Sequence, residues 1–197
     1  MNKFATILIL SLGVAAMQAE EKPVRKFKSV HGVMTIENKT ENVIVQESET
    51  ELWMKGENQR SETAFKGAKS VAITRGSLQY TYQLGGKVGG IHHLTEEDDN
   101  NISELVGMWK LGNKAGSGVA EGIACDKFQL FVEDTTITIW ISQQFDFPVK
   151  AVMAQDDGMT KSTKTALFKN LVFDQDLPDS LFEPPKNVKF KDAQPSK

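Results

Sequence analysis

The fold of this chain is decided by one stretch, Leu78-Gln79-Tyr80-Thr81-Tyr82-Gln83-Leu84. Apolar or aromatic side chains alternate here with polar ones at every second residue. Since successive side chains of a β-strand point to opposite faces of a sheet, this period predicts a strand that is buried on one face and solvated on the other. The buried face is large and aromatic.

Alternation of the same kind continues on both sides of this stretch. Val71 and Ile73 share a parity before it, and Ile137, Ile139 and Ile141 share one after it. Further strands are predicted at residues 27–36, 43–54, 59–65, 68–74, 119–132, 136–142, 148–153 and 161–173. About nine or ten strands with a single helix are expected for an α+β fold that is mainly β, an antiparallel sheet with helix on one face.

One segment breaks the period of two and reads as a helix. Four apolar residues recur at the i, i+3, i+4, i+7 spacing of an amphipathic helix: Ile102, Leu105, Val106 and Trp109. Glycine-rich stretches at residues 85–90 and 112–118 bound the segment, and we expect both to be flexible. The helix is therefore expected to sit on hinges against one face of the sheet.

The first residues predict export from the cytoplasm. Lys3 precedes an apolar run at residues 4–16, which is too short to cross a bilayer comfortably as a helix. A signal peptide at residues 1–19, cleaved after Ala19 or earlier after Ala16, fits this pattern. Residues 20–197 then form one domain, with residues 191–197 as a flexible tail.

Composition excludes several classes of function. The formal net charge is −3, so the chain has no global attraction to nucleic acid. Cys125 is the only cysteine and cannot form an intramolecular disulfide. It is either a reactive thiol or a small buried hydrophobe, and its apolar neighbours Ile123 and Phe128 favour burial.

No motif identifies a catalytic or metal site, so no cofactor and no enzymatic activity are predicted. His92 and His93 are adjacent, and on an extended segment their rings point to opposite faces. The acidic residues 96–99 lack the spaced oxygen ligands of a calcium loop. Paired carboxylates abound, but none has the apolar setting that would tune it for acid/base work.

Several short segments, in this order along the chain, carry a resemblance to a known family. They lie at residues 53–60, 105–107, 122–128, 138–141 and 178–185. In this series the chain resembles the LolA-like group of periplasmic proteins, which includes the lipoprotein carriers LolA and LolB and uncharacterised envelope families. The likeness covers roughly residues 27–190, and the tail matches the uncharacterised branch better than LolA itself.

The resemblance implies an incomplete antiparallel barrel with a helical lid on its concave face and an apolar cavity that accepts acyl chains. In LolA an arginine on an early strand hydrogen-bonds to the lid, and Arg60 occupies the matching motif. A surface or structural role for Arg60 is the alternative.

The function predicted from these observations is a periplasmic, non-enzymatic, monomeric protein that binds a lipid or an acylated lipoprotein for envelope trafficking. The residues expected to line its cavity are Tyr80, Tyr82, Leu84, Leu105, Val106, Trp109 and Ile139. The alternative is an envelope interaction module with a packed core, which binds inner- or outer-membrane proteins through a sheet edge or through Glu47, Glu49 and Glu51.

Overall fold

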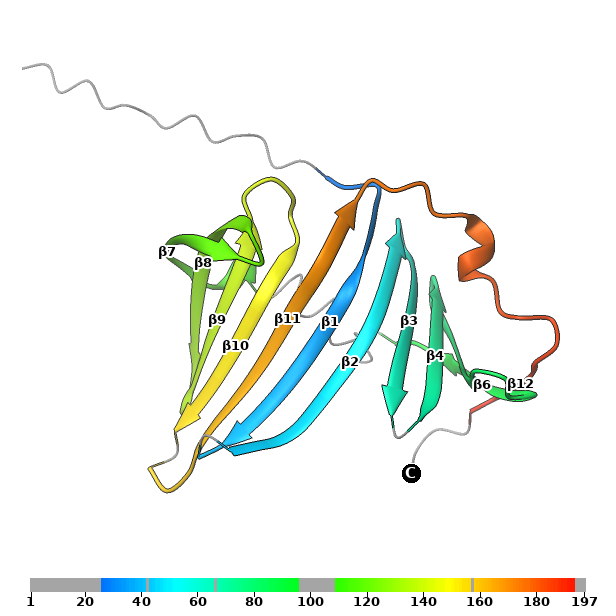
Figure 1. Cartoon of the computed structure of the whole chain (residues 1–197), viewed down its shortest axis with the longest axis horizontal. Coiled ribbons are helices and arrows are strands. Elements are labelled where there is room, and N and C mark those ends of the chain that lie inside the picture. Colours follow the sequence, from blue (N-terminus) through cyan, green and yellow to red (C-terminus); the bar gives the residue numbers. More distant parts are fainter. Residues whose placement is uncertain (1–25, 42, 66, 96–108, 157, 194–197) are drawn as a thin grey trace, which may run out of the picture.

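A computed structural model describes residues 26–41, 43–65, 67–95, 109–156 and 158–193. These residues form a 12-stranded sheet and contain no α-helix (Figure 1). Among them there is also no helix of sufficient length and hydropathy to span a membrane. The expectation of a mainly β chain with a curved antiparallel sheet is confirmed.

Along the chain the first six strands are β1 (Ser29–Thr40), β2 (Val43–Lys55), β3 (Asn58–Phe65), β4 (Ala68–Arg75), β5 (Leu78–Gln83) and β6 (Val88–His93). The other six are β7 (Asn113–Ala120), β8 (Ile123–Val132), β9 (Thr135–Ser142), β10 (Pro148–Asp156), β11 (Lys161–Phe173) and β12 (Lys189–Asp192). The order across the sheet is β12-β6-β5-β4-β3-β2-β1-β11-β10-β9-β8-β7, so β12 and β7 are its two edges. Neighbours are antiparallel except β12, which pairs with β6 in parallel.

Three strands were not expected from the sequence: β6, most of β7, and β12. The predicted strand at residues 119–132 covers the end of β7, a turn at Glu121 and Gly122, and β8. The stretch 112–118, expected to be flexible, mostly belongs to β7, and the glycine-rich stretch before residue 91 runs into β6. Because glycine has no side chain, the glycines in these strands leave no alternation of apolar and polar residues to detect. These segments are ordered by pairing with neighbouring strands.

The expected lid helix falls largely on residues 102–108, which lie outside the described residues. Its last residue, Trp109, begins a short 3-10 helix, η2 (Trp109–Leu111). The tail expected at residues 191–197 begins later, because Lys191 and Asp192 belong to β12. The signal peptide predicted at residues 1–19 also lies outside the described residues.

The strand register fixes which side chains share a face, because directly paired residues point the same way. One set of paired residues joins four strands: Ile36, Ala166, Ala151 and Ile139. A second set joins five strands: His31, Trp53, Arg60, Ile73 and Tyr80. Since Ile36 and His31 are an odd number of residues apart in β1, the two sets lie on opposite faces, called here the inner and the outer face.

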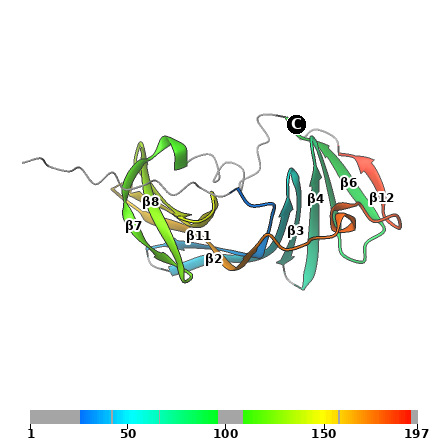
Figure 2. The same ribbon diagram turned by 90° about the horizontal axis from the view of Figure 1, so that it is seen from above.

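Figure 2 shows the sheet bent into a trough, with β7 and β8 as one wall, β2 and β11 as the floor, and β3 and β4 as the other wall. The segment after β11 runs along the outside of the β3–β4 wall and contacts Val71 and Ile73 on the outer face. The inner face therefore looks into the trough.

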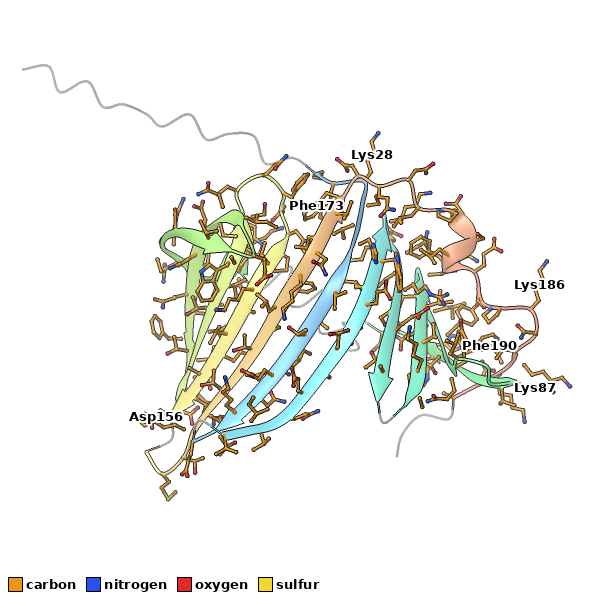
Figure 3. All side chains as sticks on the ribbon, in the orientation of Figure 1. Lys28, Lys87, Asp156, Phe173, Lys186 and Phe190 are labelled. Atoms are coloured by element: carbon orange, nitrogen blue, oxygen red, sulfur yellow. The ribbon has the colours of Figure 1, made fainter. Side chains whose placement is uncertain are left out.

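Clusters of buried apolar side chains lie on both faces of the sheet. On the inner face, Met34, Leu52, Phe147 and Phe168 pack together, and a row of buried isoleucines on β9 continues this core. On the outer face, Val71 and Ile73 are buried under the C-terminal segment. Figure 3 shows the wide separation of Phe173, which packs against the inner core, and Phe190, which packs edge-on against Tyr80 on the outer face.

Candidate binding site

The inner face of β8, β9 and β10 carries the apolar surface closest to the predicted site. Ile137, Ile139 and Ile141 on β9 are buried, because β9 lies between two strands whose side chains flank it. Partly buried apolar side chains pack around this row: Ile36, Trp109, Phe128, Leu130 and Met153. These residues, with the isoleucine row, are called here the inner apolar site.

Trp109 is held at this site by η2. Its ring packs on Phe128 with centroids 4.8 Å apart and planes inclined by 52°. The indole Nε1 is buried and has no hydrogen-bond partner among the described residues. Since a buried indole N–H usually finds an acceptor, this donor has its hydrogen bond still to make.

Beside the inner apolar site, aromatic side chains fill the neighbouring end of the trough. Phe145 and Phe147, in the connection between β9 and β10, pack with Phe27 and Phe173. Phe147 is fully buried and Phe145 is nearly so. This end of the inner face is therefore filled by contacts between aromatic rings, whereas the side chains around Ile139 are mainly aliphatic.

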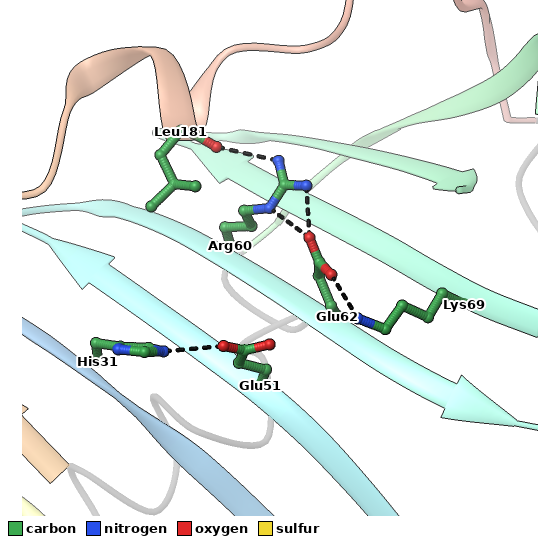
Figure 4. A network of polar contacts seen from close by, with 6 residues as sticks. All are labelled: His31, Glu51, Arg60, Glu62, Lys69 and Leu181. Atoms are coloured by element: carbon green, nitrogen blue, oxygen red, sulfur yellow. Dashed lines mark hydrogen bonds and ion pairs between the residues drawn. The ribbon is translucent and has the colours of Figure 1, made fainter. Parts of the chain in front are cut away.

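On the outer face, Arg60 belongs to a half-buried charge network (Figure 4). Its Nε and Nη2 donate to Oε1 of Glu62 over 3.1 and 2.7 Å, and Nη1 donates to the carbonyl oxygen of Leu181 over 3.2 Å. Lys69 reaches Oε2 of the same carboxylate at 3.2 Å. Burial alone would raise the pKa of Glu62, but the hydrogen bonds from Arg60 and Lys69 outweigh it and lower the pKa.

The network joins the sheet to the C-terminal segment. Leu181 lies in the 3-10 helix η3 (Asp179–Phe182), and Lys55 donates to the carbonyl oxygen of Leu177 and to the carboxylate of Asp179, each over 2.7 Å. The described polar partners of Arg60 are thus Glu62 and the C-terminal segment. Control of a lid by Arg60 stays a prediction, since residues 96–108 lie outside the described residues.

Beside this network, His31 stacks on Trp53. The two rings are 5.1 Å apart and nearly parallel, and His31 Nε2 lies 3.1 Å from Oε1 of Glu51. Glu47 and Glu49 continue the same outer row and are exposed.

The structure brings together only part of the predicted cavity. Trp109 and Ile139 meet at the inner apolar site, while Tyr80 and Tyr82 lie on the outer face against Phe190. Leu84 is 55% exposed at the end of β5. Leu105 and Val106 lie outside the described residues. One common cavity for these side chains does not exist among the described residues, because the register places Tyr80 and Ile139 on opposite faces.

Sequence reasoning missed Phe128, Leu130 and Met153 as site residues. A signal was present, since Phe128 and Leu130 share a parity within one predicted strand. Parity alone does not show which face of the sheet these side chains occupy. The register between β8 and β9, in which Phe128 pairs with Ile139, places them on the same face as Ile139.

Cys125 is fully buried, and its thiol donates to the carbonyl oxygen of Ile123 over 3.3 Å. Burial raises the pKa of the Cys125 thiol. Because the thiolate is the nucleophile, a buried protonated thiol is a packing residue. The expectation of a small buried hydrophobe is confirmed.

The residues that could bind metal are dispersed. His92 contacts Thr81 Oγ1 at 3.1 Å, and His93 lies 3.6 Å from Asp192. Within the described ranges, no group of three or more histidine, cysteine, aspartate or glutamate residues gathers to hold a metal ion.

Comparison with known proteins finds one matching family and several solved structures with a similar fold. A family described as "Predicted periplasmic protein (DUF2092)" matches residues 99–190. No curated protein matches the chain in sequence. An uncharacterised conserved protein from Thermus thermophilus matches in structure with a TM-score of 0.56 and 9% identity, over 84% of this chain and 91% of that one.

The complex of MucA and MucB from Pseudomonas aeruginosa also matches, with a TM-score of 0.52 and 12% identity over 81% of this chain. This chain shares its fold with both of these solved structures. It spans 57% of the matched MucA/MucB chain, so the likeness concerns one part of that protein. A LolA superfamily protein of Nitrosomonas europaea, NE2245, matches at a TM-score of 0.44 and 10% identity, over 83% of this chain and 94% of that one.

The resemblance that the sequence showed is thus confirmed at the level of the fold. The open, curved, antiparallel sheet is the architecture expected of the LolA-like group. The family description also agrees with the predicted compartment.

Proposed function

We propose that this chain is a non-enzymatic binding protein of the periplasm that holds an acyl chain of a lipid or lipoprotein at the inner apolar site. The observation that carries the proposal is the ring of partly exposed, long apolar side chains around Ile139. At the Phe147 end of the trough, by contrast, aromatic rings fill the face by packing on one another. The signal peptide expected at residues 1–19 supports the compartment.

Apolar burial is sufficient to give such a site useful affinity. Each methylene removed from water contributes about 0.8 kcal/mol, so a partly inserted acyl chain binds without any ion pair. The buried Nε1 of Trp109 adds a donor for a carbonyl or ester oxygen near the end of the chain. Residues 102–108, including Leu105 and Val106, are proposed to close over the acyl chain as an amphipathic lid.

The test measures binding of cis-parinaric acid, a fluorescent fatty acid, to the mature chain and to matched variants. Trp109→Ser is expected to weaken binding at least ten-fold, because the largest contact of the site is lost. Tyr82→Ser is the control, since Tyr82 lies on the outer face against Phe190. Met153→Gln gives a second site variant in case Trp109→Ser unfolds.

Equal binding by folded Trp109→Ser and Met153→Gln would refute the acyl site, as would equal losses in the Tyr82 control. Native mass spectrometry of the protein from a periplasmic extract provides an independent readout, in which a stoichiometric lipid adduct is expected.

A second candidate function, binding of an envelope protein, rests on two observations. The matched MucB was solved as a complex with MucA. In this chain Glu47 and Glu49 form an exposed acidic row on the outer face. Photo-crosslinkers placed at Glu47 and Glu49 should capture an envelope protein if this row is the interface, and absence of any adduct would exclude it.

A further inference from the structure

The inner face changes character beyond β1. From β2 to β6, the charged side chains of the described strands all lie on the outer face: Glu47, Glu49, Glu51, Lys55, Arg60, Glu62, Lys69 and Arg75. The inner face of the same strands carries mainly serine, threonine and glutamine, with small or aliphatic residues such as Ala72 and Val88 and, at the end of β6, His92. A sheet face that only meets water normally includes charged residues, so an uncharged polar face indicates a further requirement.

A pocket of about 400 Å³ lies on this uncharged face, within the size range of small-molecule sites. The polar side chains that line it are Ser61, Thr63, Ser70, Thr81 and Gln83. Cross-strand hydrogen bonds hold several of them in place. Gln83 Nε2 donates to Ser70 Oγ over 2.9 Å, and Thr63 Oγ1 lies 2.8 Å from Thr50 Oγ1.

Two glycines of β6 line the pocket for different reasons. A Cβ at Gly89 would meet Phe190 at 2.6 Å on the outer face, so close packing requires that glycine. A Cβ at Gly90 would meet only Thr81 Oγ1 and His92 Nε2 at 3.3 Å, with Ala193 at 3.9 Å. Gly90 therefore keeps space free next to the Thr81 hydroxyl.

The strands that form the pocket restrict how it can recognise a ligand. β3, β4 and β5 are each paired on both sides, so their backbone groups are occupied by the sheet. An extended peptide, which binds through backbone groups at a sheet edge, has no such edge here. Recognition must come from side-chain hydroxyls and amides, which both donate and accept hydrogen bonds.

We propose that this pocket binds an uncharged saccharide unit. Sugar hydroxyls are also donors and acceptors, and a neutral ligand leaves no buried charge without a partner in a pocket lined by neutral side chains. Its distance from the inner apolar site along the sheet makes it a second site, so the proposal does not depend on acyl binding. Hydrogen bonding alone gives affinity in the millimolar range.

The test is a titration of the 15N-labelled mature chain with cellobiose and with N,N′-diacetylchitobiose, followed by amide chemical shifts. The largest shifts are expected at Ser61, Ser70, Thr81 and Gly90. Thr81→Val should weaken binding about five-fold through one lost hydrogen bond. Gly90→Val, which fills the space, should abolish binding. Thr74→Val is the control, because Thr74 shares the face but does not line the pocket.

Absence of shifts with both sugars up to tens of millimolar would overturn the proposal. So would shifts that Thr81→Val leaves unchanged, or equal shifts from glucuronate and glucosamine, which would remove the preference for neutral ligands. Binding of cis-parinaric acid by Thr81→Val should match the unmodified chain. Loss of fatty-acid binding there would show one shared site.

Discussion

The two halves of the sheet differ in which face is apolar. In β1 and β8–β11 most apolar side chains face the trough, while Trp140 lies on the outer face between Lys127 and Lys150 and packs against a smaller buried cluster around Cys125. In β3–β6 the apolar side chains face outward and the C-terminal segment covers them. The change occurs on β2, where neighbouring Leu52 and Trp53 pack into the inner and the outer core. One sheet can therefore support an inner core next to the trough and an outer core under the C-terminal segment.

The largest expected effect tests whether these cores are separate. Ile139→Ala and Ile73→Ala remove the same side chain from fully buried positions on opposite faces. Each is expected to lower the free energy of unfolding by about 2–5 kcal/mol. If the cores are independent, the double variant should be additive within about 0.5 kcal/mol in urea unfolding. A larger coupling would mean one core.

The next effect concerns the network that joins the C-terminal segment to the outer face. Arg60→Met leaves Glu62, whose side chain is 13% exposed, with Lys69 as its remaining cationic partner. The expected loss is about 1–3 kcal/mol, the cost of an unsatisfied buried group. Limited proteolysis should cut near residue 181 sooner in this variant. Unchanged stability together with unchanged cleavage would contradict the role of Arg60 as an anchor.

The same network predicts how stability depends on pH. The pKa of Glu62 is lowered in the folded chain, so on acidification the unfolded chain binds the proton first. The stabilisation is present at neutral pH and is lost on acidification, as the pH falls from the pKa of Glu62 in the unfolded chain through its lowered pKa in the folded chain. Arg60→Met should therefore make the free energy of unfolding depend less steeply on pH in the acidic range. If the stability of Arg60→Met fell as steeply with decreasing pH as that of the unmodified chain, the pH dependence would belong to other carboxylates.

A smaller contrast lies between neighbouring glycines of β6. Gly89→Ala must displace Phe190 or the carbonyl oxygen of Thr81, and a loss of about 1–3 kcal/mol is expected. Gly90→Ala has looser neighbours and ordinary backbone angles, so its effect should lie within about 0.5 kcal/mol. Thermal unfolding distinguishes the two. Equal losses would show that β6 tolerates no side chain on either face.

The smallest effect is expected at the other edge of the sheet. Lys114 on β7 pairs with Asp126 on β8 at 2.7 Å, and this hydrogen bond is the main cause of the lowered pKa of Asp126. The pair is largely exposed, so Lys114→Ala should cost about 0.2–1 kcal/mol and less in high salt. If Lys114→Ala lowered the free energy of unfolding as much as Arg60→Met does, the β7 edge would be held as strongly as the C-terminal segment.

Much of the fold was predictable because burial on one face leaves a period of two. Val71, Ile73 and the isoleucines of β9 lie in strands with the predicted parity. β6 and β7 were missed because their glycines carry no such pattern. The sequence also could not reveal that Tyr80 and Ile139 face opposite ways, since alternation within a strand says nothing about register between strands. The cover over Tyr80 and Val71 comes from a segment about a hundred residues later.

Two pairings of the sheet join parts of the chain that are far apart in sequence. β1 pairs with β11, and β6 pairs with β12. Because loop closure precedes the gain from such contacts, folding is expected to be slow, on a scale of about milliseconds to seconds. The outer core cannot close until β12 has been synthesised, so an incomplete chain exposes both the edge of β6 and the aromatic face of Tyr80 and Tyr82. Pairing of β12 is thus the step that covers these aggregation-prone surfaces.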